Sequence, residues 1–390
     1  MTRRICIVTG SRADYGLLSG LMREITADAS LELLVVATGS HLSAQFGHTV
    51  DAIRADGYKV DAEVPLALDD DSRFAIANAA GQALSGMAQA FERLKPEVIV
   101  VLGDRYEIFA AASAALLMNI PIAHIHGGEL TLGAVDDALR HAITKMASLH
   151  FVAARDYARR VIQMGEPSDR VFEVGAPGVD LMQSIVYLNA EKLGQDLSLP
   201  LFNPLLLVTY HPVTRRTDDE GAVLDELLSA LERLPDARIV ITGVNADAGN
   251  QVVSGRLQSF AQRHPDRVSL HASLGQARYL SVMRLAGAVV GNSSSGVIEA
   301  PALGVPTVNI GTRQNGRLKA YSVIDCAEDA QAIFQAIQKA LDPSFRSSIA
   351  GQPLPYGHGG AARMMKDALK AFSREQLAEA KPFRDMVGRV

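Results

Sequence analysis

The sequence predicts an α/β protein made of two Rossmann-like domains, each built around a parallel sheet. Short apolar, β-branched runs alternate with longer amphipathic helical stretches, a pattern typical of βαβ units. The pattern restarts near residue 205, after a loose segment at residues 194–204. At 390 residues the chain is also longer than one ordinary core supports, which favours two domains.

The expected strands are buried apolar runs bounded by polar or glycine-rich turns. In the first half they lie at residues 5–9, 31–38, 98–102, 121–125, 151–154 and 171–174. In the second half they lie at residues 205–209, 238–242, 268–270, 288–290 and 307–310. Helical patterns separate them, at residues 44–56, 71–94 and 107–118 among others. We expect domains at residues 1–180 and 181–365, with a helical tail at 366–390 that returns to the first domain.

Composition narrows the class of protein. The net charge of −5 argues against a general nucleic-acid binder, which needs a basic face. Cys6 and Cys326 lie in different halves and cannot build a disulfide framework, which favours a reducing compartment. The apolar run at residues 5–8 is too short for a signal peptide, and no run reaches membrane-spanning length. We therefore expect a cytoplasmic protein without a membrane or nucleic-acid partner.

Polar residues cluster just past the carboxyl ends of the predicted strands. They are Asp104, Glu129, His211, Asn245 and the loop at residues 291–299. In open α/β sheets ligands bind at this edge. Two such edges that face each other across a cleft predict a two-domain enzyme of the glycosyltransferase-B type.

The loop from Gly291 to Glu299 follows an apolar run and leads into a short helix. Unpaired backbone N–H groups at a helix N-terminus can hold phosphate, and Glu299, about one turn further on, is placed to accept hydrogen bonds from a ribose. A serine helix cap followed by a carboxylate that complements the helix dipole gives the same pattern. The loop alone leaves both interpretations open.

The first βα turn runs from Gly10 to Asp14 and lacks the G-x-G-x-x-G pattern of dinucleotide enzymes, which argues against NAD. Arg12 in this turn is a candidate phosphate ligand or a surface partner of Asp14. Asp104 and Arg105 place a carboxylate and a guanidinium together at a strand end, although an Asp there also commonly caps a helix.

Asp136 and Asp137 open a helix, with Arg140 and His141 four residues further on. This spacing permits Asp136–Arg140 and Asp137–His141 contacts, or the acids simply complement the helix dipole. Several carboxylates in one site push their pKa values apart, so that one acts as a base and another as an acid. His124, His126 and His141 have no matched ligand spacing that would indicate a metal.

Several long motifs together resemble one known family. They are Ser11 to Tyr15, Gly103 to Arg105, His124 to Glu129, Arg140 to Lys145, His211 to Thr214, Gly291 to Gly296 and Gly311 to Gln314. In this order they resemble the hydrolysing UDP-N-acetylglucosamine 2-epimerases of the bacterial sialic- and legionaminic-acid branch. The resemblance covers roughly residues 3 to 320. It implies a glycosyltransferase-B fold, anti elimination of UDP to a glycal, hydration to the free 2-epimer, and no NAD or metal.

The resemblance also implies roles for individual residues. Asp104, Glu129 and Asp136 are the expected acid–base carboxylates. His126 stands where some relatives carry Glu, so that either His126 or Glu129 takes over that role. The expected substrate- and UDP-binding residues are Arg12, Arg105, His211, Asn245, Leu274, Ser293, Ser294, Glu299 and Arg313. His211 is also a catalytic candidate, as a group that protonates or binds the leaving phosphate.

The substrate is expected to be UDP-N-acetylglucosamine or a UDP-2,4-diacetamido-trideoxyhexose, and the protein to be a homo-oligomer (dimer or tetramer). Two alternatives stay open: a glycosyltransferase of the same fold that uses a UDP-sugar donor, and a non-catalytic nucleotide-sugar binding protein. The carboxylates at 104, 129 and 136 weigh against both, because neither needs several acids.

Overall fold

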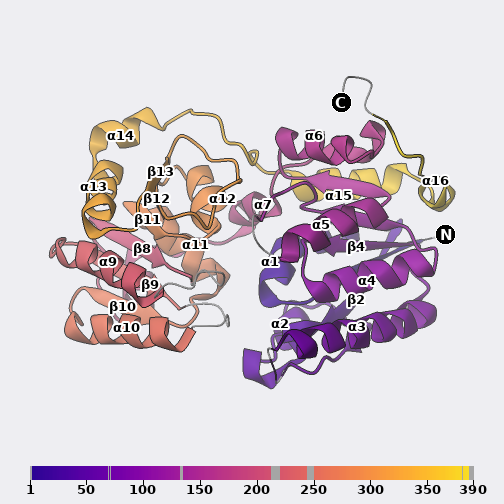
Figure 1. Ribbon diagram of the computed structural model, residues 1–390, viewed down its shortest axis with the longest axis horizontal. Helices are drawn as coiled ribbons and strands as arrows, with labels where there is room; N and C mark the ends of the chain where they lie inside the picture. Colours follow the sequence, from indigo (N-terminus) through magenta and orange to yellow (C-terminus); the bar gives the residue numbers. More distant parts are fainter. Residues whose placement is uncertain are drawn as a thin grey trace. The chain divides into compact units, whose positions relative to one another are not determined.

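The computed structural model describes residues 2–68, 70, 72–131, 135–211, 220–243, 250–379 and 381–385. The chain forms two compact units (Figure 1). The first unit joins Met1–Leu181 with Tyr356–Val390, and the second is Met182–Pro355. Among the described residues, no helix is both long and apolar enough to cross a membrane.

The first unit contains a parallel sheet of seven strands in the order β3-β2-β1-β4-β5-β6-β7. The strands are β1 (Arg3–Thr9), β2 (Leu31–Thr38), β3 (Ala62–Val64), β4 (Val98–Leu102), β5 (Ile122–Ile125), β6 (Leu149–Val152) and β7 (Val171–Glu173). The strand order reverses between β1 and β4, which is where open α/β sheets bind ligands. The central strands read as continuous apolar runs because helices cover both faces of the sheet.

The helices of the first unit lie between these strands. They are α1 (Arg12–Thr26), α2 (Val50–Ala55), α3 (Arg73–Leu94), α4 (Tyr106–Leu117), α5 (Val135–Met146), α6 (Arg155–Gln163), α15 (Ala361–Ala371) and α16 (Arg374–Ala378), with α7 (Pro177–Ser184) at the boundary. Short 3₁₀ turns lie at Gly39–Leu42, Ala44–Phe46 and Ser168–Arg170.

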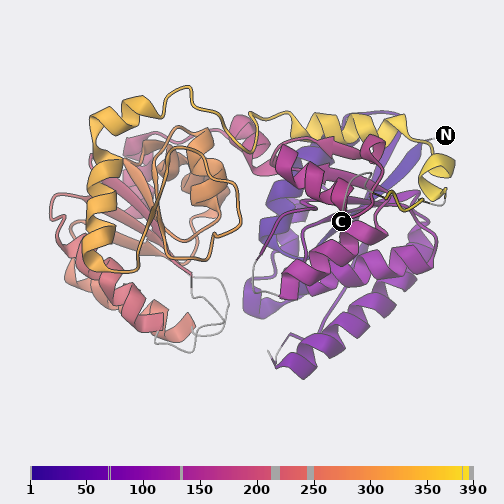
Figure 2. The same ribbon diagram turned by 45° about the horizontal axis from the view of Figure 1, so that its top comes forward.

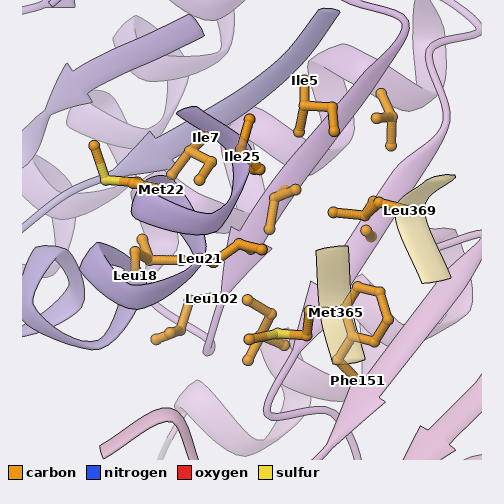
Figure 3. Packing of buried hydrophobic residues seen from close by; sticks show 14 of the residues in the cluster. Ile5, Ile7, Leu18, Leu21, Met22, Ile25, Leu102, Phe151, Met365 and Leu369 are labelled. Carbon is orange, nitrogen blue, oxygen red and sulfur yellow. The ribbon is translucent and has the colours of Figure 1, made fainter. Parts of the chain in front are cut away.

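Helix α15 completes the core of the first unit, although along the chain the whole second unit stands between it and the other strands and helices of that core. Leu18, Leu21 and Ile25 line one face of α1, and Met365 and Leu369 of α15 belong to the same buried cluster (Figure 3). Figures 1 and 2 both show α15, drawn in yellow, among the indigo and magenta elements of this unit. The apolar residues of α1 recur every three to four positions, which is the spacing that buries one helical face.

The residues after α16 are anchored to the same unit. Lys381 Nζ contacts the Glu166 carboxylate and donates hydrogen bonds to the carbonyl oxygens of Lys145 and Ala147. Glu166 is fully buried and also pairs with His150 and with Lys145 Nζ. These three donors hold the pKa of Glu166 at about 2, against burial, which acts in the opposite direction.

The second unit contains a parallel sheet of six strands in the order β10-β9-β8-β11-β12-β13. The strands are β8 (Leu205–Thr209), β9 (Arg238–Thr242), β10 (Val268–His271), β11 (Ala288–Gly291), β12 (Thr307–Ile310) and β13 (Val323–Cys326). The helices are α8 (Ala190–Leu197), α9 (Glu220–Glu232), α10 (Asn250–Arg263), α11 (Gly275–Leu285), α12 (Ser295–Ala302), α13 (Ala330–Leu341) and α14 (Pro343–Ser348). The strand order reverses between β8 and β11, as it does between β1 and β4.

The two α/β units and the strands expected inside them are confirmed, and three local expectations were wrong. Edge strands β3 and β13 were not anticipated. The segment at residues 194–204 was expected to be loose, and residues 198–204 contain no helix or strand, but residues 194–197 form the end of α8, whose first turn is capped by the Asn189 side chain. The helix expected at residues 44–56 is instead a 3₁₀ turn and α2, separated around Gly47 and His48, both of which have positive φ.

Candidate active site

The carboxyl ends of β4 and β5 carry the acid–base candidates of the first unit. Asp104 lies two residues past the end of β4, and Glu129 lies four residues past the end of β5. Asp136 is in the first turn of α5, the helix that follows β5 in the chain. Glu129 is buried, while Asp104 and Asp136 are partly exposed.

Arg140 of α5 is the direct partner of Asp104. Its Nη2 contacts Asp104 Oδ2 and donates a hydrogen bond to Thr131 Oγ1 at 3.1 Å. The arginine side chain is 5 % exposed and that of Asp104 is 18 % exposed. The helical spacing suggested an Asp136–Arg140 pair, but the guanidinium turns to the strand end instead. The i, i+4 contact expected between Asp137 and His141 is present, at 3.6 Å.

One face of α5 packs against the ends of β4 and β5. Asp136, Arg140 and Thr144 follow one another at intervals of four residues and therefore share that face. Thr144 Oγ1 lies 3.2 Å from Nδ1 of His124, whose Nε2 lies 2.8 Å from the carbonyl oxygen of Gly103. Burial lowers the pKa of His124 to about 3, so this buried imidazole is neutral and links the helix to the loop that carries Asp104.

Asp136 and Glu129 both lie within electrostatic reach of Asp104. The pKa of Asp104 is raised above its usual value, first by burial and then by the negative charges of Asp136 and Glu129. Arg140 opposes this rise through its charge and its hydrogen bond. Burial and the neighbouring negative charges therefore favour the protonated form of Asp104, and Arg140 favours the ionised form.

His126 and Glu129 form a pair at the end of β5. His126 Nδ1 contacts Glu129 Oε1, and the two side chains are 12 % and 3 % exposed. His126 adopts a left-handed backbone conformation with φ of 67°, which is uncommon for a residue with a side chain and is found more often at functional sites. His126 and Glu129, the two residues between which the sequence left an acid–base role undecided, are therefore in direct contact.

Arg105, which lies between β4 and α4, is close to two further acids, Glu107 of α4 and Asp14 near the end of β1. Arg105 Nε donates a hydrogen bond to Oε1 of the buried Glu107 at 2.6 Å. Asp14 accepts hydrogen bonds from the backbone N–H of Gly10 and lies near Arg105, while burial raises its pKa to about 6. Arg12 is exposed at the start of α1.

In the second unit, the loop after β11 is joined to the end of β8. Asn292 Oδ1 accepts a hydrogen bond from His211 N at 2.7 Å, and Asn292 Nδ2 donates one to His211 O at 2.8 Å. Gly291 has φ of 137°, and a Cβ there would lie 2.0 Å from Thr209 O, so only glycine allows the two strand ends to approach this closely. The loop and His211 therefore form one rigid edge.

The serine hydroxyls of this loop bond to one another and to a tyrosine. Ser295 Oγ lies 3.0 Å from Ser293 Oγ and 2.5 Å from Tyr279 OH. Ser294 is the N-cap of α12, but its side chain makes no capping hydrogen bond. Ser293 Oγ instead accepts a hydrogen bond from the backbone N–H of Ser295 at 3.4 Å, so a serine at the start of α12 still serves as a partial cap.

Arg313 and Gln314 approach the loop from the end of β12. Arg313 Nη1 and Gln314 Nε2 both donate to the carbonyl oxygen of Asn292, at 3.2 and 2.8 Å. Burial and the charge of Arg313 lower the pKa of His211 to about 4. His211 is therefore neutral near pH 7 and donates or accepts hydrogen bonds as an uncharged imidazole.

The remaining expected binding residues are spread over the second unit. Glu299 lies in α12, partly exposed and close enough to Tyr279 to raise the pKa of that phenol, although burial is the larger cause. Leu274 is buried at the N-cap of α11. Asn245 lies outside the described residues.

Comparison with known proteins identifies the family. Residues 23–370 match the model of the UDP-N-acetylglucosamine 2-epimerase family. This match spans most of the chain. The chain belongs to this family.

The epimerase chain also has curated relatives. It is 39% identical over 346 residues to the GDP/UDP-N,N'-diacetylbacillosamine 2-epimerase (hydrolyzing) of Campylobacter jejuni, which covers 89% of each chain. It is 34% identical to the UDP-N,N'-diacetylbacillosamine 2-epimerase (hydrolyzing) of Legionella pneumophila, over 95% of this chain and 96% of the relative. The crystal structure of UDP-GlcNAc 2-epimerase from Neisseria meningitidis bound to UDP-GlcNAc matches with a TM-score of 0.81 at 20% identity, over 95% of this chain and 100% of that one. The fold is thus the glycosyltransferase-B-like fold of this family.

Four residues of the epimerase that contact the candidate site were not assigned roles from the sequence. They are Glu107, Tyr279, Asn292 and Gln314. Asn292 and Gln314 stand inside motifs that were singled out, and Glu107 lies two residues past another, so proximity in the chain was a usable signal for these three. Tyr279 lies on a different helix from the serine loop and gave no such signal.

Proposed function

We propose that the chain is a hydrolysing 2-epimerase of a UDP-N-acetylhexosamine, which releases UDP and the free 2-epimer of the sugar. The observation that carries the proposal is the group of Asp104, Glu129 and Asp136 beside Arg140, past the carboxyl ends of β4 and β5. Membership of the epimerase family supports it. A transferase or a binding protein of this fold has no use for three neighbouring carboxylates.

The reaction proceeds in two steps, an elimination and a hydration. In the first, a base removes the C2 proton and the C1–O bond breaks, so that UDP leaves with the bonding electrons and a C1–C2 double bond forms. In the second, water adds its hydroxyl to C1 while a proton returns to C2 on the opposite face. Positive charge that develops at C1 as UDP leaves acidifies the C2–H bond, and nearby carboxylates stabilise that charge.

The residues divide by role. Asp104, Glu129 and Asp136 exchange the protons, with His126 acting through or beside Glu129. Arg12, Arg105, His211, Asn245, Leu274, Ser293, Ser294, Glu299 and Arg313 hold the sugar nucleotide. A neutral His211 next to Arg313 and the serine loop gives the departing diphosphate hydrogen-bond donors and one full positive charge.

The proposal extends to the substrate and the setting. The names of the Campylobacter and Legionella relatives favour UDP-N,N'-diacetylbacillosamine, a 2,4-diacetamido-trideoxyhexose, over UDP-N-acetylglucosamine. We place the reaction in nonulosonic acid biosynthesis in the cytoplasm, where the free thiols Cys6 and Cys326 stay reduced. In this proposal residues 1–180 supply the proton chemistry and the second unit, Met182–Pro355, supplies most of the UDP site, in a homo-oligomer.

The decisive experiment incubates the protein with each UDP-sugar in D₂O, without an acceptor. We expect UDP and a free 2-epimeric sugar that carries one deuterium at C2, with faster turnover of the diacetamido substrate. Sugar release with retained C2 configuration and no deuterium contradicts the elimination mechanism. Transfer that requires an added acceptor indicates a glycosyltransferase, and binding without turnover indicates a sensor.

Glu299 gives a test of the UDP site. Glu299→Ala removes the carboxylate that is proposed to accept the ribose hydroxyls, so UDP affinity is expected to fall by about 1–3 kcal/mol. Isothermal titration calorimetry with UDP measures it, with Glu232→Ala on the exposed face of α9 as the control. Equal affinity in Glu299→Ala and the control contradicts the ribose assignment.

A further inference from the structure

Glu107 is a buried carboxylate that the proposed reaction does not use. Its side chain is 0% exposed, and its Oε1 accepts the hydrogen bond from Arg105 Nε at 2.6 Å. Among the described residues, its Oε2 has no hydrogen-bond partner. Removing a carboxylate from water is costly, and a buried ion pair is commonly no more stabilising than apolar side chains of the same volume. Stability alone therefore does not explain why Glu107 is there.

The ends of two neighbouring strands are built to leave room for this carboxylate. Gly10 follows β1, and a Cβ at that position would lie 2.7 Å from Glu107 Oε1. Gly39 follows β2 with φ of 58°, and a Cβ there would lie 3.1 Å from the same oxygen. Side chains at these positions would displace Glu107, so the local backbone is arranged around it.

Arg105 links this carboxylate to the site. It directly follows Asp104 and is 48% exposed, so the guanidinium lies at the surface while Glu107 lies beneath it. A guanidinium is planar and has five N–H donors in a fixed fork. Holding Nε therefore fixes the plane of the whole group and the directions of the Nη donors.

The charges around Arg105 keep it a cation. Glu107 is the main cause that raises the Arg105 pKa, and Asp14 adds to it. Asp14 in turn hydrogen-bonds to the backbone of Gly10, so both acids belong to the same strand edge. Two acids around one half-exposed arginine leave it oriented and fully charged.

We propose that Glu107 is a positioning residue, which orients Arg105 so that its outer N–H donors bind an oxygen of the substrate's sugar. The acceptor is a hydroxyl or an acetamido carbonyl oxygen. This inference rests on the proposed function, because Asp104 brings Arg105 next to the sugar only if Asp104 exchanges protons with it. Most of the residues proposed to hold the nucleotide belong to the second unit, and Arg105 is assigned to the sugar, so Arg105 and Glu107 discriminate UDP-sugar from UDP.

The test compares steady-state kinetics of the full-length wild type, Glu107→Gln, Arg105→Met and the double variant. Arg105→Met loses a hydrogen bond from a charged group, which is expected to raise KM for the UDP-sugar about tenfold or more. Glu107→Gln keeps an acceptor oxygen but loses its charge, which weakens the hold on Arg105 and is expected to raise KM by a smaller factor. The kcat value and the inhibition constant for UDP are expected to stay within a few-fold of wild type. Because Glu107 acts through Arg105, the double variant is expected to be no worse than Arg105→Met alone.

Controls separate orientation from charge and from folding. The surface pair Arg54–Glu63, whose side chains are 45% and 41% exposed, gives matched substitutions Arg54→Met and Glu63→Gln that should leave KM unchanged. Added guanidinium is expected to restore activity to Arg105→Ala but not to Arg105→Ala/Glu107→Gln. If Glu107→Gln does not fold, as judged by thermal unfolding, Arg105→Lys carries the test: it keeps the charge above Glu107 but loses the fixed fork, and KM should still rise.

Each other result overturns the inference. A wild-type KM in Glu107→Gln or Arg105→Lys removes the positioning role, and a further loss in the double variant shows that Glu107 does not act through Arg105. A UDP inhibition constant that rises in parallel with KM assigns Arg105 to the diphosphate instead of the sugar. If the wild type releases no UDP from either sugar, the proposed function fails. Calorimetry with UDP-sugar and with UDP then tests the role of Arg105 and Glu107 in binding. Equal affinities of wild type and Arg105→Met for the UDP-sugar overturn the inference.

Discussion

Asp104→Asn is expected to abolish turnover, with kcat lower by about 10²–10⁴-fold, the usual contribution of a general acid or base. Asparagine keeps the shape of the side chain and still accepts a hydrogen bond from Arg140, but it neither takes up nor releases a proton. Because Asp104 is not among the proposed UDP-binding residues, UDP affinity is expected to stay within a few-fold of wild type. Coupled detection of UDP release gives the rate, and calorimetry gives the affinity.

The matched control is Asp51→Asn on α2, whose side chain is 67% exposed. It is expected to keep wild-type turnover. A rate for Asp104→Asn that approaches this control would remove Asp104 from the mechanism. A loss of UDP affinity as large as the loss of rate would instead point to a general disturbance of the fold.

Arg140→Met is expected to move the pH dependence of catalysis. Arg140 favours the ionised form of Asp104, against burial and the charges of Asp136 and Glu129. An opposite charge favours the ionised form of a carboxyl group, so its removal should raise the Asp104 pKa further. The limb of the kcat profile that Asp104 supplies then moves to higher pH, because a higher pH is needed to ionise the same fraction of the group.

A direct measurement follows the carboxyl carbon of Asp104 by NMR in protein labelled at Asp Cγ, with the resonance assigned by its loss in Asp104→Asn. Arg140→Lys keeps the positive charge and is expected to restore part of the shift. The control is Arg159→Met on α6, an arginine whose side chain is 66% exposed and pairs with Asp156. An Asp104 resonance that titrates at the same pH in Arg140→Met and in the control contradicts the pairing.

The central strands could be predicted because parallel strands buried on both faces appear as uninterrupted apolar runs. β2, β4, β8, β9 and β12 have the predicted bounds. The edge strands β3 and β13 are short and mix charged with apolar residues, as in Ala62–Val64 and Val323–Cys326, so local pattern does not separate them from loops. Their pairing depends on the neighbouring strand and not on their own composition.

The site was predictable where a motif residue and its contact lie at the same strand end, as for Glu129 with His126 and for Asn292 with His211. Arg140 shows the limit. Helical spacing offered Asp136 as its partner, while the partner found is Asp104, 36 residues away. Helix spacing indicates which residues can meet along one helix, but the direction of a long side chain depends on what packs opposite that face.

The return of α15 to the first unit has a consequence for how the protein is made. The second unit, Met182–Pro355, is continuous in the chain, so all of it has left the ribosome before Met365 and Leu369 can reach the core beside α1. At roughly 5–20 residues per second, that delay is on the order of ten seconds or more. During this delay, Leu18, Leu21 and Ile25 lack part of their covering, so the nascent first unit exposes an apolar surface on α1 that is suited to chaperone binding. Its core is completed only after α15 has been synthesised.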